Sequence, residues 1–179
     1  MSGPDDAAVR AYAAEKRFAE GTLSRWLMQD APAQIALLAV AERLRLGDNQ
    51  FRAVLDDVVD IAARRGCAVA AVLEDPAVRA VWARGLGRNE AMKALREALR
   101  RLRYPQLTAA EQRVSALTRS LRLPAGARLE CPPLLEGEEM TLVVRGSSAT
   151  QLRARAAAAV RALQDEALEE LFAVLEGRA

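Results

Sequence analysis

Hydrophobic residues recur every three or four positions through the first hundred residues, the spacing that places them on one face of an α-helix. Gly and Pro residues divide this pattern into segments. The second segment is apolar on most sides between Ile35 and Leu44, so we expect it at the centre of the core. The pattern predicts helices over 4–30, with Gly21 a candidate break, and over 31–47, 48–66, 67–75, 76–85 and 89–104.

Residues that favour helix ends mark several of these boundaries. Asp48 or Asn49 is expected to cap the third segment, and Asn89 the sixth. Gly47 and Gly66 are expected to close the second and third segments in the left-handed conformation that glycine adopts easily.

After Pro105 the pattern changes. Thr108 followed by Glu111 is the signature of a capping box, and the segments 127–133 and 140–146 alternate as strands do. With Gly137 in the loop, these two segments predict a β-hairpin, and two further helices follow it. A lone hairpin is only marginally stable, so it must lie on the flanking helices or pair its edge with another chain.

The expected fold is therefore mainly α. A helical bundle spans residues 1–104, and a small C-terminal α+β part of order helix–β-hairpin–helix–helix spans 105–179. Trp26 and Trp82 each lie among apolar residues at helical spacing, which predicts that both anchor the core.

The charge along the chain is distributed in bands. The net charge is only +2, but residues 67–128 carry twelve basic and five acidic groups, whereas residues 129–179 carry five basic and nine acidic groups. All but two of the 26 basic residues are arginine. That bias also arises from a high-GC genome, so the number of arginines does not by itself indicate a binding function.

The composition argues against several catalytic chemistries. The chain has no histidine, which removes the commonest general base and imidazole metal sites. Cys67 and Cys131 lie far apart and lack the spacing of a zinc site or a disulfide framework. No phosphate-binding or dinucleotide-binding glycine motif is present. We therefore expect no cofactor and no metal, and a non-enzymatic role is favoured over an enzymatic one.

Two groups of carboxylates are candidates for cation binding. Asp56 and Asp60 lie four residues apart on one predicted helix face, and Glu136, Glu138 and Glu139 fall in the predicted hairpin loop. A solvent-exposed acidic surface is the expected role of both groups.

The sixth predicted helix carries the strongest binding signal. Its apolar residues form one narrow stripe, and basic residues occupy most of the remaining surface. Guanidinium groups suit phosphate, and each phosphate neutralised releases counterions, so even contacts without sequence preference give useful affinity. The candidate nucleic-acid-binding residues are Arg84, Arg88, Lys93, Arg96, Arg100, Arg101 and Arg103.

Two other interpretations of the basic residues stay open. The helix can be a core helix with a hydrated arginine face, or it can dock the acidic C-terminal segment of its own or a neighbouring chain. A weak resemblance to a DNA-binding helix-turn-helix covers residues 58–76, but its second helix has Ala68, Val69 and Ala70 where polar base-reading residues are expected. A helical hairpin in the core is the favoured interpretation of that stretch.

The sequence thus predicts a non-enzymatic accessory or adaptor module that contacts the backbone of DNA or RNA through a basic amphipathic helix. The alternative is a protein–protein or homo-oligomeric scaffold that uses the β-hairpin and the acidic C-terminal helix. No apolar run approaches the roughly 20 residues that span a bilayer. The acidic start of the chain does not resemble a signal peptide, so a cytoplasmic location and no membrane contact are expected.

Overall fold

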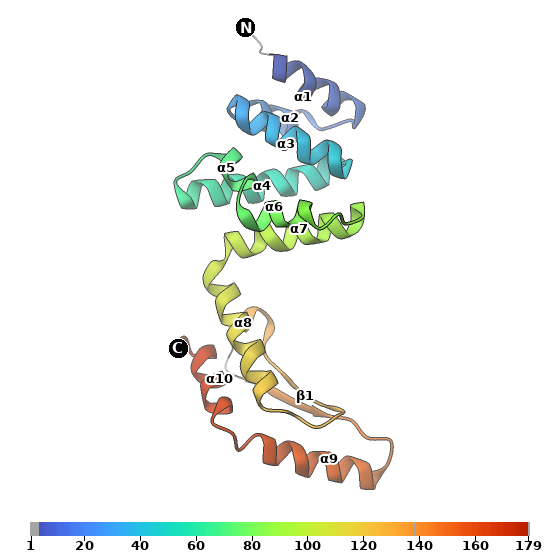
Figure 1. The fold of residues 1–179 in the computed structure, drawn as a ribbon, viewed down its shortest axis with the longest axis vertical. Helices are drawn as coiled ribbons and strands as arrows, with labels where there is room; N and C mark the ends of the chain where they lie inside the picture. The colour runs from blue at the N-terminus through green and yellow to red at the C-terminus, as the bar shows by residue number, and fades with distance from the viewer. Residues whose placement is uncertain (1–3, 138, 179) are drawn as a thin grey trace. The chain divides into compact units, whose positions relative to one another are not determined.

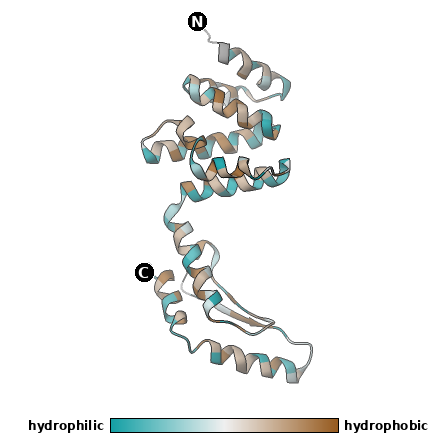
Figure 2. Cartoon of the chain, viewed as in Figure 1, coloured by the Kyte–Doolittle hydropathy of each residue, from teal (hydrophilic) through white to brown (hydrophobic). Residues whose placement is uncertain are grey.

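The computed structural model describes residues 4–137 and 139–178, and it confirms a mainly helical fold with one β-hairpin in the last third (Figure 1). By its internal contacts the chain divides into two compact units at the bond between Tyr104 and Pro105. We describe each unit by itself. Hydrophobic and hydrophilic residues are interspersed along the helices of both units (Figure 2). Within the described residues, no helix is both long enough and apolar enough to cross a bilayer.

Between residues 4 and 104, the elements of the first unit are all helices. Each helix buries one side against its neighbours, and α3 and α4 supply many of the fully buried side chains, as the apolar sequence of α3 predicts. The helices are α1 (Pro4–Glu15), α2 (Glu20–Leu27), α3 (Ala31–Leu44), α4 (Asp48–Arg65), α5 (Val69–Leu73), α6 (Pro76–Ala83) and α7 (Arg88–Arg103).

Four aromatic rings form the centre of the N-terminal end of this unit. The ring centroids of Trp26 and Phe51 are 4.2 Å apart, and those of Phe18 and Phe51 are 5.1 Å apart. Tyr12 contacts both Phe18 and Trp26 edge-on. Such pairs contribute about 0.5–1.5 kcal/mol each beyond the burial of their area, so the cluster holds α1, α2 and α4 together.

The Tyr12 hydroxyl also links α1 to the end of α3. It lies 2.7 Å from the carbonyl oxygen of Ala41 and 3.0 Å from that of Leu46, and donates to this pair of acceptors. Burial raises the pKa of Tyr12 above its usual value, although the bond to Leu46 opposes this shift. The hydroxyl therefore stays protonated and keeps its role as a donor.

Several helix ends lie where the sequence did not predict them. The first predicted helix breaks between Glu15 and Glu20 rather than at Gly21, which lies inside α2. Helix α3 ends at Leu44 with Arg45 in the left-handed conformation. Gly47 does not close α3 but precedes α4 as its N-cap. These predictions were wrong because glycine serves either end of a helix, and the sequence pattern alone cannot assign it to one.

The expected side-chain caps of α4 and α7 were wrong for a related reason. Asp48 is the first residue of α4, and its carboxylate accepts a hydrogen bond from the backbone N–H of Ala19, a contact with the preceding loop. Asn89 lies inside the first turn of α7, whose N-cap is Gly87. By contrast, Gly66 ends α4 with a positive φ of 61°, as predicted.

The second unit combines three helices with the hairpin. Its strands pair antiparallel, with Ala127 opposite Val144 and Glu130 opposite Thr141. A short 3₁₀ turn, η1 (Pro133–Leu135), follows the first strand. The other elements are α8 (Pro105–Ser120), β1 (Ala127–Glu130), β2 (Thr141–Val144), α9 (Ala149–Ala162) and α10 (Ala167–Leu175).

The core of the second unit is small. Leu171 of α10 and Val114 of α8 are at its centre, and Leu129 and Met140 of the hairpin region pack against it. The buried residues between 105 and 137 and between 139 and 178 are Val114, Leu121, Ala159, Ala167 and Leu171.

Two predicted caps in the second unit have opposite outcomes. Ser148 caps α9 by accepting a hydrogen bond from the backbone N–H of Gln151 at 3.1 Å, as expected. Thr108 does not form a capping box, because α8 already begins at Pro105 and Thr108 lies within its first turn. Its hydroxyl is buried and makes no hydrogen bond among the described residues.

Candidate nucleic-acid interface

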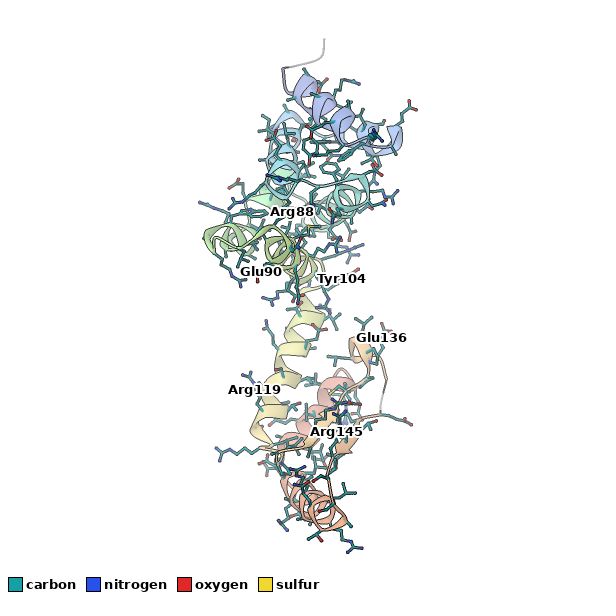
Figure 3. All side chains as sticks on the ribbon, turned by 90° about the vertical axis from the view of Figure 1, so that its right-hand side faces the viewer. Arg88, Glu90, Tyr104, Arg119, Glu136 and Arg145 are labelled. Atoms are coloured by element: carbon teal, nitrogen blue, oxygen red, sulfur yellow. The ribbon has the colours of Figure 1, made fainter. Side chains whose placement is uncertain are left out.

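Helix α7 is amphipathic in the manner that the sequence predicts. Gly87 is the N-cap of the helix, and Pro105 follows its last turn. Arg88 and Glu90 lie at its start, and Tyr104 lies just after its end (Figure 3). One side packs into the first unit against α4 and α6. The buried residues of α7 are Ala91, Met92, Leu95, Ala98 and Leu99.

The opposite side of α7 presents a row of polar and basic residues. Asn89, Lys93, Arg96 and Arg100 follow one another at spacings of four, three and four, so they share one side of the helix. Lys93 and Arg96 are exposed. With Met92 and Glu97, these four residues line one open surface hollow of about 480 Å³. We call Lys93 and Arg96 the cationic pair.

Arg103, a predicted nucleic-acid contact, faces the acidic side of α4 instead. Its guanidinium lies 2.8 Å from an Asp57 oxygen and 2.7 Å from an Asp60 oxygen. The three side chains are only 27–31% exposed. Asp60 also pairs with Arg64, one turn along α4. Arg103 thus fastens the end of α7 to α4, and its charge is neutralised within the unit.

The pKa values of these groups follow from their surroundings. Burial raises the pKa of Asp57 above its usual value, although Arg103 opposes this shift. Burial alone would raise the pKa of Asp60 as well, but hydrogen bonds from Arg64 and Arg103 hold it below its usual value. Burial alone would lower the pKa of Arg103, but its hydrogen bond to Asp60 and the neighbouring negative charges hold this pKa above its usual value.

Two further members of the predicted set also have partners within the first unit. The Arg88 guanidinium donates to the carbonyl oxygens of Leu44 and Arg45, at 2.6 and 3.2 Å, where α3 ends. Arg101 forms an ion pair with Glu97 at 3.0 Å, one turn back along α7. Arg88 is therefore a C-terminal cap of α3, and the charge of Arg101 is balanced locally.

The structure thus divides the predicted set of basic residues. Within the described part of the chain, Arg84, Lys93 and Arg96 are exposed and have no carboxylate or carbonyl partner. Arg100 lies in the same row as Lys93 and Arg96 and shares their hollow. Arg88, Arg101 and Arg103 serve internal contacts. The sequence could not make this division, because the partners of Arg88 and Arg103 lie more than forty residues away.

The two aspartates of α4 that were candidates for cation binding form ion pairs with arginines. Asp56 pairs with Arg25 of α2 at 2.5 Å, and Asp60 pairs with Arg64 and Arg103. Among the described residues no group of three or more potential metal ligands is close enough to hold an ion. In the hairpin loop, Glu138 lies outside the described residues.

One feature of the first unit had no signal in the sequence. Trp82 of α6 is half-buried rather than enclosed, and the Arg43 guanidinium of α3 lies 4.7 Å from its ring centroid. Arg43 also donates to the backbone oxygen of Trp82. These two residues border a groove of about 310 Å³ between α3, α5 and α6, with Ala36, Ala39 and Leu73 among its other lining residues.

The stretch with the weak helix-turn-helix resemblance does not have the form that base readout requires. Helix α5 is only five residues long, Val69–Leu73, and Val72 and Leu73 are buried. A recognition helix must present polar side chains to a groove of DNA. The favoured interpretation of this stretch as part of the core agrees with these contacts.

Comparison of the chain with protein-family models, with curated proteins and with solved structures finds no match in any of the three.

Proposed function

We propose that the protein binds nucleic acid through α7, with the cationic pair as the central contact and Arg84 as a flanking contact. It would act as a non-enzymatic accessory or adaptor in the cytoplasm. The observation that carries this proposal is the row on α7, where Lys93 and Arg96 face outward without an ion-pair partner and share an open hollow with Arg100. Glu97 also lines this hollow, but its carboxylate pairs with Arg101.

The chemistry of the row suits a phosphate backbone. Arginine donates in a planar fork that matches phosphate oxygens, and lysine supplies a compact charge with three donors. The two side chains are one helical turn apart, so both can reach one strand. Contacts to phosphate position a protein without reading the base sequence, so binding through this row has little sequence preference.

The expected affinity is modest. A small number of phosphate contacts gives about 10⁻⁴ to 10⁻⁶ M at physiological salt for binding without sequence preference. Three contacts by Arg84, Lys93 and Arg96 give a slope of log K against log salt of about −3 on duplex DNA. Such binding suits a protein that a second interaction holds near its site of action.

The test is the binding of labelled duplex DNA, single-stranded DNA and single-stranded RNA at low salt. Lys93→Glu with Arg96→Glu should abolish the binding, because each substitution replaces an attraction with a repulsion. The matched control is Arg10→Glu with Arg52→Glu, which makes the same change of net charge at exposed positions of α1 and α4. This control should retain most of the affinity.

Two results would overturn the proposal. One is the absence of binding to all three nucleic acids at low salt. The other is an equal loss of binding in both double variants, which would indicate a response to net charge rather than to the row on α7.

A further inference from the structure

The hairpin of the second unit leaves the backbone of one strand open. The N–H of Arg145 donates to the carbonyl oxygen of Gly126 at 2.8 Å, so these two residues form a hydrogen-bonded pair. Such pairs alternate along an antiparallel ladder. The polar backbone groups of Leu142 and Val144 therefore point away from β1. Within the described residues, no other group forms a hydrogen bond to them.

The two outer edges of the hairpin differ in chemistry. Strand β1 carries Arg128 and Glu130, which pair with each other, and Pro132 and Pro133 follow it. Charges and prolines are the usual means by which proteins prevent an edge strand from pairing further. Strand β2, Thr141–Val144, has no charge, no proline and mostly β-branched residues. Only the β2 edge has the composition of a strand that pairs.

Helices pack against the hairpin. The guanidinium of Arg155 in α9 donates to the Arg145 oxygen at 2.7 Å. A Cβ atom added to Gly126, which immediately precedes β1, would lie 2.8 Å from the same guanidinium. Helix α9 therefore crosses both strands on one face. Leu129 and Met140 pack into the core that α8 and α10 form.

We propose that a second copy of this chain pairs with β2 along its open edge, antiparallel and about a twofold axis at Val143. In this register Leu142 of each copy is opposite Val144 of the other copy. The outward backbone groups of both residues then form four hydrogen bonds between the copies. Because the strand is uncharged, the pairing opposes no like charges, and the two hairpins become one four-stranded sheet of order β1-β2-β2-β1.

The charges beside β2 are complementary in this register. Arg145, at the end of β2 (Figure 3), is opposite Thr141 of the other copy and diagonal to its Glu139. Diagonal neighbours on one face of a sheet lie within reach of long side chains. The twofold axis creates this Arg145–Glu139 contact twice. A second copy therefore supplies both the hydrogen bonds and the opposite charges that the edge requires.

The burial in the second unit also favours a partner. Only five of its described residues are buried, and none of these belongs to the hairpin. A two-stranded hairpin is marginally stable alone, whereas three or more strands with an apolar face are stable. Pairing with a second copy gives the hairpin the additional strands. The large apolar side chains of α9 that are exposed in the single chain are Leu152 and Val160.

The first test is the mass of the full chain in solution by sedimentation equilibrium. The wild type should form a species of twice the chain mass. Val143→Glu should be a monomer, because the twofold axis places the two new charges directly opposite each other, whereas within its own hairpin the glutamate is opposite Arg128. The control is Glu130→Lys, which reverses a charge on the same face of the hairpin but in β1. It should remain a dimer.

The second test addresses the register and does not depend on Val143. Glu139→Arg and Arg145→Glu should each weaken the dimer about tenfold, because each converts two attractive contacts into repulsive ones. The double variant exchanges the two charges and should restore the wild-type dissociation constant. The proposal would be overturned by a strictly monomeric wild type. It would also be overturned if the dimer of the double variant were weakened by the combined effects of the two single substitutions. Neither result depends on nucleic-acid binding.

Discussion

Neutralising selected basic residues of α7 should separate the residues proposed to contact nucleic acid from those that make contacts within the fold. The first variant is Lys93→Gln with Arg96→Gln, which removes the cationic pair. The second is Arg101→Gln with Arg103→Gln, which removes the same charge from the same helix. In the structure, Arg101 pairs with Glu97, and Arg103 pairs with Asp57 and Asp60.

The expected magnitude follows from counterion release. Each phosphate neutralised on duplex DNA contributes about 0.9 to the slope of log K against log salt. Loss of the cationic pair should therefore reduce the slope by about 1.8. The second variant removes charges that already form ion pairs within the protein. Its slope of log K against log salt should therefore change by less than about 0.5.

The assay is fluorescence anisotropy of a labelled duplex, titrated with each protein at a series of salt concentrations. Circular dichroism of each variant provides the control for folding. An equal reduction of the slope in both variants would refute the reasoning, because it would mean that the internal ion pairs open when the protein binds.

Other predictions concern the first unit. Tyr12→Phe should lower the free energy of unfolding by about 1–2 kcal/mol in urea titrations, because the Leu46 carbonyl loses its donor. Since the pKa of Tyr12 is raised in the folded state, its contribution is complete below pH 10.0 and is lost as the pH rises further. The phenylalanine variant should lack this alkaline loss, and an identical pH dependence in both proteins would contradict the assignment. Arg103→Gln should raise the carboxyl pKa values of Asp57 and Asp60 in NMR titrations, because its guanidinium lowers both. Unchanged values would show that the contact is absent in solution.

Elements that depend on local patterns could be predicted from the sequence. Three such elements are the amphipathic helix α7, the hairpin of β1 and β2, and the end of α4 at Gly66. Each is determined by residues that are close to one another in the sequence. The short helix α5 was also expected, because Pro76 limits how far a helix from Cys67 can extend.

The division of the basic residues could not be predicted, because it depends on tertiary contacts. Arg96 and Arg103 are seven residues apart and both belong to the polar part of α7 in the sequence pattern. Only the packing of α7 on α4 places Arg103 beside Asp57 and leaves Arg96 exposed. The sequence around a charged residue on an amphipathic helix thus predicts that the residue lies on the polar side. It does not predict which residue, if any, forms an ion pair with it.

The location of the aromatic residues has a practical consequence for experiments on the two units. Both tryptophans and both tyrosines of the chain lie at or before Tyr104, and Trp26 belongs to the ring cluster of the first unit. Intrinsic fluorescence and near-ultraviolet absorbance therefore report on the first unit, whereas residues 105–179 contribute almost nothing to either signal. Far-ultraviolet circular dichroism detects the helices of both. Thermal unfolding can be followed by fluorescence and by dichroism on the same sample. The difference between the two normalised melting curves would report the unfolding of the second unit without any label.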